Sequence, residues 1–507
     1  MKSLNYLILA TAGGAVIATS GCSTAPKEKT PINILWLFGE DISPWMPAYG
    51  DNTVKTPNLD FLIDNGVLFT NCYASCSVSS PTRSSLVTGM MQTTIGAHNH
   101  RTARTDKLIY NLPEGIKVLP ELLKEKGYHT FCTGKDDFNW HYNWHDYWTG
   151  TYEWAGFYDK CGVGSWNDRK EGQPFFGEIE LYGGKNHGKV DNPVNPDDVE
   201  VPPYYPDCEN IRNQRATHYN QIQLTDIEIG AAIEEMKKDG VYENTIIVFL
   251  SDNGYQMMRD KQFLYDSGIK MPLVISCPGN PQLLKDLGIE IGSTRDDLVS
   301  LMDLNATTLS LAGVDIPDYM EAKDVFADDF HRDYIVAARD RCDYTIDRIR
   351  AIRTKEFKYI RNFMTDRPLL QPQYRDKQAW YKDLIKIHEE GKIKFSDDWM
   401  SDVRPAEELY DIVNDPHEIN NLAKDPAYTA SLAQMRGYLE SWIEETDDKG
   451  QYPETQKALE IVYQRWGDRC VNPEYDEVKK YMKVDTTDVD RYQMEVKAKK
   501  AKEAAKK

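Results

Sequence analysis

The sequence has few of the features that mark zinc-finger, membrane-spanning or nucleic-acid-binding proteins. Its nine cysteines include no C-x-x-C pair, which excludes the usual spacing of a structural zinc site. After residue 22 no apolar run is long enough to cross a bilayer. Lys and Arg number 60 against 80 Asp and Glu, and the net charge of −20 opposes nucleic-acid binding. Internal repeats and Gly/Ser-rich linkers are also lacking, so we expect a globular body that binds no nucleic acid.

The first residues, MKSLNYLILATAGGAVIATSGCS, are typical of an export signal. The sequence TSGC resembles the bacterial lipoprotein cleavage box, which implies that Cys22 is lipidated after residues 1–22 are removed. Residues 23–30 would then form a polar tether. We therefore expect an exported lipoprotein, periplasmic or on the outer membrane or cell surface, that contacts the membrane through its lipid anchor. The alternative is an ordinary signal peptide with Cys22 as an incidental thiol.

Apolar, β-branched runs alternate with helical patterns along residues 31–325. The runs at 32–38, 129–135, 174–181, 245–254 and 271–279 are predicted strands, and 209–238 is a long predicted helix. This alternation predicts an α/β fold with a large mixed, mostly parallel sheet sandwiched by helices. Residues 326–450 read as short strands and a helix, which predicts a smaller C-terminal α+β domain. Residues 451–507 form a C-terminal extension with a Lys-rich tail.

Acidic and amide side chains follow two of the predicted strands where those strands end. Glu40 and Asp41 come after the first, and Asp252 and Asn253 after the run TIIVFLS. Ligands of α/β sheets bind outside the carboxyl ends of the strands, and oxygen donors suit Ca²⁺ or Mg²⁺. Each pair alone is weak evidence, because Asp and Asn also favour turns. Together they predict a hard-cation site.

The stretch SVSSPTRSSLVTG, residues 77–89, is rich in hydroxyl groups and precedes a helical pattern. Residues 79–89 resemble the sulfatase signature: Cys or Ser, any residue, Pro, any residue, Arg, then Thr-Gly after four more. TPNLDFLIDNGVLFTNCYA, SDNGYQMMRDKQFLYDSGIKMPLVI and LYDIVNDPHEINNLA are also similar to that family, so the resemblance covers about residues 32–447. A polar helix cap is compatible with it. The resemblance implies an alkaline-phosphatase-like fold and a sulfuric ester hydrolase.

The resemblance further implies that Ser79 is oxidised to formylglycine by a sulfatase-maturating enzyme. The aldehyde hydrate would offer one oxygen to the metal and another to sulfur, and would eject sulfate as the aldehyde re-forms. Pro81 and Arg83 would belong to the maturase recognition sequence, with Arg83 also neutralising charge at the site. One Ca²⁺ per chain would be bound by Glu40, Asp41, Ser79, Asp252 and Asn253, with Glu40 where the family more often has Asp.

Lys135 and Lys261 occupy the positions of the family's sulfate-binding lysines. The family commonly has His two residues after the first lysine, but this chain has Asp137. Lys185 stands where the family often has another His, and His187 follows two residues later. His187 is either the general acid for the leaving group or an ordinary loop histidine; if Lys185 takes that position instead, the leaving group is protonated differently.

His98, His100 and Arg101, in TTIGAHNHRT, are candidates for deprotonating the aldehyde hydrate or for binding a sugar acid; the alternative is a polar loop after a helix. Arg341, in AARDRCD, is a further candidate for a contact with a sugar. VPPYYPDCENIRNQRATHYNQI looks most like the heparan-type branch that includes N-sulfoglucosamine sulfohydrolases. We therefore expect cleavage of sulfate esters or N-sulfate from glycosaminoglycan fragments. The alternatives are a phosphatase or phosphodiesterase of the same superfamily that uses unmodified Ser79, and a non-catalytic glycan-binding lipoprotein. The sequence leaves open whether Cys72 and Cys76 form a disulfide.

Overall fold

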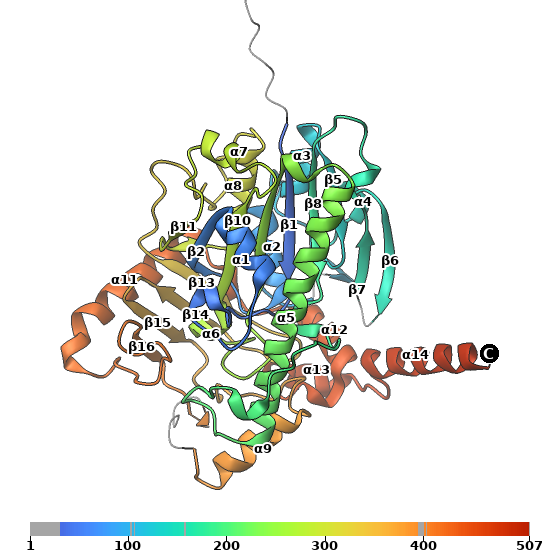
Figure 1. Ribbon diagram of the computed structural model, residues 1–507. Helices are drawn as coiled ribbons and strands as arrows, with labels where there is room; N and C mark the ends of the chain where they lie inside the picture. Colours follow the sequence, from blue (N-terminus) through green and yellow to red (C-terminus); the bar gives the residue numbers. More distant parts are fainter. Residues whose placement is uncertain are drawn as a thin grey trace, which may run out of the picture. The chain divides into compact units, whose positions relative to one another are not determined.

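A mixed sheet of eight strands forms the larger part of the fold (Figure 1). The computed structural model describes residues 31–101, 104–105, 107–156, 159–393, 400–401 and 403–505. The strand order is β11-β2-β10-β9-β1-β8-β5, and β12 also pairs with β2. The bounds are β1 Asn33–Gly39, β2 Gly66–Tyr73, β5 His129–Thr133, β8 Phe175–Leu181, β9 Thr245–Ser251, β10 Lys270–Ser276, β11 Ser293–Arg295 and β12 Val299–Ser300.

Strands β5, β8, β1 and β9 run parallel, whereas β10 is antiparallel to both β9 and β2. The prediction of a mixed, mostly parallel sheet is confirmed. Along β1, Ile34, Trp36 and Phe38 belong to one buried core, and Leu35 and Leu37 belong to another. Both faces of this strand are therefore covered, which explains its continuous apolar run.

The helices divide between these two cores. Side chains of α2 (Ser79–Thr88), α3 (Leu119–Glu125) and α8 (Asp303–Leu311) pack in the first core. The second is covered by α1 (Pro57–Asp64) and by α5 (Glu209–Lys238), the long helix that crosses the sheet in Figure 1. The predicted helix at 209–238 is confirmed. Shorter elements are β3 Arg104–Thr105, β4 Leu108–Ile109, α4 Trp144–Tyr147, β6 Thr151–Gly156, β7 Asp159–Val163, α6 Asp266–Ile269 and α7 Pro281–Asp286.

A second, antiparallel sheet has the order β13-β14-β15-β16. One of its faces packs on α11, and the other on the segment that follows β9, through Phe263, Leu264 and Tyr265. The C-terminal sheet and helix are thus present as predicted. The bounds are β13 Ile335–Arg339, β14 Ile349–Arg353, β15 Phe357–Asn362, α9 Ala379–Glu389, β16 Glu407–Asp411, α11 Thr429–Thr446, α12 Gln456–Trp466, α13 Asp476–Tyr481 and α14 Asp488–Ala504.

The predicted signal peptide at 1–22, with Cys22, and the tether at 23–30 lie outside the described residues. Within the described ranges, no helix combines the length and hydropathy that a membrane crossing needs. The boundaries predicted near residues 325 and 450 remain a prediction. Cys72 and Cys76 are both free, buried thiols in the structure.

Candidate active site

The two acidic pairs meet because their strands are neighbours. Gly39 at the end of β1 pairs with Ser251 at the end of β9, in parallel register. Glu40, Asp41 and Asp252 each place a carboxylate oxygen within 4.8 Å of the others. The expected convergence at this edge of the sheet is therefore present.

Backbone contacts and a nearby amide fix the carboxylates in place. The Asp41 N–H donates to Asp252 Oδ1 over 3.1 Å, and Asn253 Nδ2 donates to Asp41 Oδ1 over 2.8 Å. Asp41 has a φ of 55°, a conformation that is costly for a residue other than glycine. A Cβ at Gly183, whose φ is 52°, would lie 2.2 Å from the Glu40 carbonyl oxygen. Glycine at 183 thus permits close packing beneath the acidic pair.

Ser79 is the first residue of α2, and its side chain reaches the same cluster. Its Oγ donates to Asn253 Oδ1 over 3.1 Å, and the residue is 3% exposed. Val78 is the helix N-cap and supplies no side-chain cap, while Gly89 ends the helix with a φ of 67°. The hydroxyl-rich stretch is therefore both a helix start and part of the candidate site.

Arg83 lies one turn further along α2 and connects three strands. Its Nε is 3.2 Å from Asp252 Oδ2, and its Nη1 is 3.1 Å from Glu178 Oε1. The guanidinium also lies over the Phe38 ring, 3.9 Å from its centroid. Burial lowers the pKa of Arg83, but the nearby carboxylates, Asp252 first, outweigh it and hold the pKa well above the ordinary value. Arg83 therefore stays charged and neutralises the buried acidic groups.

Two glutamates on β8, the buried Glu178 and the partly buried Glu180, were not predicted from the sequence. Burial raises the pKa of Glu178 to about 8, although Arg83 acts in the opposite direction. Burial and the neighbouring Glu40 raise the pKa of Glu180 well above its ordinary value. The Glu178 side chain is thus largely protonated at neutral pH. The position of the two glutamates at alternate residues of an apolar strand is a weak sequence signal.

Three lysines bind the acidic pair. Lys135 Nζ is 2.5 Å from Glu40 Oε1, and Lys261 Nζ is 2.5 Å from Asp41 Oδ1. Lys185 also pairs with Glu40. Burial alone raises the pKa of Glu40, but the charges of Lys135 and Lys185 outweigh it and hold the pKa well below the usual range. All three predicted lysines therefore lie at the cluster.

The residues that stand in the family's histidine positions differ in their surroundings. Asp137 is buried, with Oδ2 3.0 Å from Lys135 Nζ and 3.7 Å from Arg101 Nη2. The Lys185 side chain is 47% exposed and reaches Glu40. His187 is exposed and makes no hydrogen bond or ion pair within the described part of the chain. The structure thus brings Lys185, and not His187, to the carboxylates.

The other candidate sugar contacts are spread over adjacent loops. Arg101 approaches the lysines through Asp137, whereas His100 Nδ1 is 3.1 Å from Asp343 Oδ1. Arg341 pairs with Glu454. Together with His98, it lines a cavity of about 250 Å³. Of these four residues, Arg101 has the most direct link to the acidic cluster.

The donor set at the strand ends fits a calcium ion. Five oxygen-bearing groups converge there: three carboxylates, the Asn253 amide and the Ser79 hydroxyl. Hard oxygen donors of this kind are what Ca²⁺ takes in proteins. Carboxylates this close and this buried also require cations, which the three lysines and Arg83 provide in part. The site can therefore hold a divalent ion and an anionic ligand beside a buried serine.

Comparison with known families identifies related proteins. The sulfatase family model matches residues 32–180 and 165–314. An ulvan-active sulfatase of Formosa agariphila is 30% identical, over 87% of this chain and 79% of the relative. Human N-sulphoglucosamine sulphohydrolase is 26% identical, over 82% of this chain and 91% of the relative. A crystal structure of a putative sulfatase from Bacteroides thetaiotaomicron has the same fold: TM-score 0.60, 19% identity, 85% of this chain and 96% of that one.

Proposed function

The chain belongs to the sulfatase family and is a sulfuric ester hydrolase; on that premise we propose that it removes sulfate from anionic saccharides with a formylglycine made from Ser79 and one Ca²⁺. The observation that carries the proposal is the contact of Ser79 Oγ with Asn253 Oδ1, 3.1 Å, beside three converging carboxylates. It brings the residue of the sulfatase signature to the oxygen donors of a hard cation.

The residues that would hold Ca²⁺ are Glu40, Asp41, Asp252, Asn253 and the modified Ser79. The bound ion supplies positive charge for the sulfate oxygens, and the hydrated aldehyde supplies a hydroxyl nucleophile. Arg83 forms an ion pair with Asp252 and places a positive charge beside the first turn of α2. Asn253 keeps the side chain at 79 close to the carboxylates through its amide oxygen.

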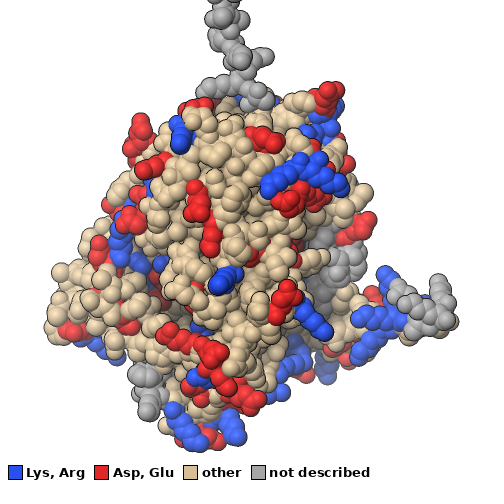
Figure 2. Space-filling model, in the orientation of Figure 1, with Lys and Arg blue, Asp and Glu red and all other residues tan. Residues whose placement is uncertain are grey.

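Local charge explains how an acidic protein attracts an anionic substrate. Acidic and basic side chains are intermixed on the face shown in Figure 2, and the chain carries a net charge of −20. Within the ion-paired cluster, five cationic side chains, Arg83, Arg101, Lys135, Lys185 and Lys261, meet the carboxyl groups of Glu40, Asp41, Asp137, Glu178, Glu180 and Asp252. A bound divalent ion adds two positive charges to this cluster. Lys135, Lys185 and Lys261 then become available to a sulfate group, for which compact ammonium charges are suited.

The names of two relatives support a proposal for the class of saccharide substrate. One acts on ulvan and another is an N-sulphoglucosamine sulphohydrolase, and both align over more than four fifths of this chain. We propose glycosaminoglycan fragments of the heparan type as the substrate, carrying sulfate esters or N-sulfate. Ulvan oligosaccharides are the second candidate, because the ulvan-active relative shares the higher identity.

Export and maturation belong to the same proposal. The segment before residue 31 has the signal and the TSGC box of a bacterial lipoprotein, so we propose lipidation at Cys22 and residence in the periplasm or at the cell surface. Formylglycine at Ser79 requires a sulfatase-maturating enzyme as a partner. Protein with a lipidated Cys22 would be recovered with the membrane fraction, and a Cys22→Ala variant would not.

The test is a mass spectrum of the peptide that contains Ser79, from protein produced together with its maturase. We expect a peptide lighter by one hydrogen molecule, and sulfate release from heparin-derived or ulvan-derived oligosaccharides that identifies the substrate. A Ser79→Ala variant should release none. Turnover by protein with intact serine contradicts the proposal and favours the phosphatase alternative. Matured protein that binds these saccharides without releasing sulfate favours a non-catalytic glycan-binding lipoprotein.

A further inference from the structure

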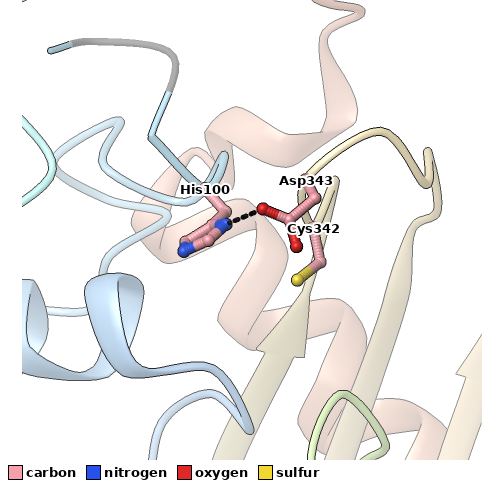
Figure 3. Close-up of side chains that lie close together, drawn as sticks. All are labelled: His100, Cys342 and Asp343. Atoms are coloured by element: carbon pink, nitrogen blue, oxygen red, sulfur yellow. Dashed lines mark hydrogen bonds and ion pairs between the residues drawn. The ribbon is translucent and has the colours of Figure 1, made fainter. Parts of the chain in front are cut away.

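A second group of metal-ligating side chains lies where the loop after α2 meets the loop after β13 (Figure 3). The His100 Nδ1 and Asp343 Oδ1 atoms are 3.1 Å apart. A ring nitrogen of His100, the Cys342 sulfur and an Asp343 oxygen all lie within 4.8 Å of one another. Two loops separated by more than 240 residues thus bring three different donor atoms together.

Hydrogen bonds that do not involve these three side chains fix both loops. The His100 N–H donates to the Arg341 carbonyl over 3.0 Å, and Arg341 Nη1 donates to the His100 carbonyl over 3.0 Å. Cys342 and Thr345 exchange backbone hydrogen bonds of 3.0 and 2.9 Å in a tight turn. Asp343 within that turn has a φ of 50°, a costly conformation that the surrounding bonds maintain. The cluster is therefore preformed.

The three donor atoms can all bind one ion. His100 Nδ1 shares a hydrogen bond with Asp343 Oδ1, and Nδ1 binds a metal when the ring takes the tautomer with its proton on Nε2. A metal ion that binds the Cys342 sulfur displaces the thiol proton to solvent.

We propose that His100, Cys342 and Asp343 bind a divalent ion of the zinc type, with solvent completing the coordination. Imidazole, thiolate and carboxylate together favour a borderline-soft ion, whereas Ca²⁺ takes oxygen alone. The thiolate and the carboxylate balance the two charges of the ion. The complex is therefore neutral, which makes it compatible with Arg101 and Arg465 nearby. This site is separate from the oxygen cluster of Glu40, Asp41 and Asp252, and it does not depend on the proposed substrate.

The ion would join the catalytic sheet to the C-terminal sheet next to the sulfate-binding lysines. Arg101, the residue after His100, reaches Lys135 through Asp137. Gln262, the residue after Lys261, donates from Nε2 to the Cys342 sulfur over 2.8 Å. One residue contact therefore links each side of the zinc-type site to a segment that contains a buried lysine, Lys135 or Lys261. We assign the ion a role in positioning these two lysines.

The test uses full-length protein stripped of metal with a chelator and titrated with Co²⁺. We expect one Co²⁺ per chain with thiolate-to-cobalt charge-transfer absorption, which the sulfur-free calcium site cannot produce, and displacement by equimolar Zn²⁺. Cys342→Ser should abolish the absorption and weaken Zn²⁺ binding by more than about 100-fold. Cys277→Ser, at another buried free thiol, and Asp252→Asn should keep both.

The proposal is overturned if wild-type protein shows no thiolate–cobalt absorption, or if Cys342→Ser binds Zn²⁺ as tightly as wild type. Should Cys342→Ser fail to fold, Asp343→Asn keeps the sulfur and should still weaken Zn²⁺ binding by at least about tenfold. Zn²⁺ should also raise the unfolding temperature of wild type and of Cys277→Ser. An equal rise in Asp343→Asn would contradict the assignment.

Discussion

Replacement of Arg83 by methionine tests the electrostatic account of the site. Arg83 is 1% exposed at its side chain, and its Nε lies 3.2 Å from the fully buried Asp252. Methionine keeps apolar volume over the Phe38 ring but leaves the Asp252 charge unpaired. Loss of one partner from a buried ion pair costs about 3–5 kcal/mol. We expect Arg83→Met to lower the free energy of unfolding by that amount in calcium-free buffer, and to abolish sulfate release.

Urea unfolding of wild type and variant measures the loss. Arg436→Met is the control, because this guanidinium is 40% exposed and its pair with Glu407 should contribute less than about 1 kcal/mol. The double variant Arg83→Met/Asp252→Asn also removes the unpaired charge of Asp252. The double-mutant cycle should give a coupling energy of about 2–3 kcal/mol between Arg83 and Asp252.

Two results would refute the reasoning. One is an Arg83→Met protein whose free energy of unfolding is within about 1 kcal/mol of wild type, because a buried unpaired carboxylate destabilises the folded state by more than that. The other is a cycle that is additive to within about 0.5 kcal/mol, which would mean that Arg83 and Asp252 do not interact.

Three further substitutions test other parts of the site. Gly183→Ala places a Cβ 2.2 Å from the Glu40 carbonyl, so calorimetry should show Ca²⁺ affinity lower by about tenfold or more, whereas Gly172→Ala, also at positive φ but in open space, should leave it unchanged. Glu178 has a pKa of about 8, above its unfolded value of 4.5, so the folded state binds the extra proton and stability falls as pH rises between these values. Glu178→Gln should therefore gain on the order of 2 kcal/mol relative to wild type between about pH 5 and pH 8 in urea unfolding, and equal pH profiles would contradict this. Lys185→Met should lower kcat/KM on sulfated saccharides by roughly 10–100-fold, the value of a charged hydrogen bond, and an unchanged kcat/KM would remove Lys185 from the sulfate site.

The convergence of Glu40 with Asp252 was predictable because it depends on topology. Both residues follow apolar runs, and the carboxyl ends of parallel strands meet at one edge of a sheet. In the structure Gly39 pairs with Ser251, and this register brings together the acidic side chains that follow the two strands. The position of Ser79 at this edge came from its signature, not from periodicity.

Other parts of the site depend on packing between distant segments and leave little trace in the sequence. Glu178 and Glu180 lie within an apolar strand and become functional neighbours only because Arg83 projects between them. The contact of Lys185 with Glu40 depends on the close packing of Gly183 beneath the Glu40 carbonyl. Sequence spacing alone could not choose between Lys185 and His187.

Backbone strain marks the site more clearly than composition does. Of the eight non-glycine residues with positive φ in the described part of the chain, five belong to the acidic cluster, the lysine segments or the two loops of the proposed zinc-type site: Asp41, Arg101, Asp137, Gln262 and Asp343. Each such residue costs about 1–3 kcal/mol, and that cost persists only where surrounding contacts fix the conformation. Ordinary loops adopt backbone conformations of lower energy. The gathering of strained residues here therefore means that contacts with the two sheets stabilise these loops and hold the charged side chains in place.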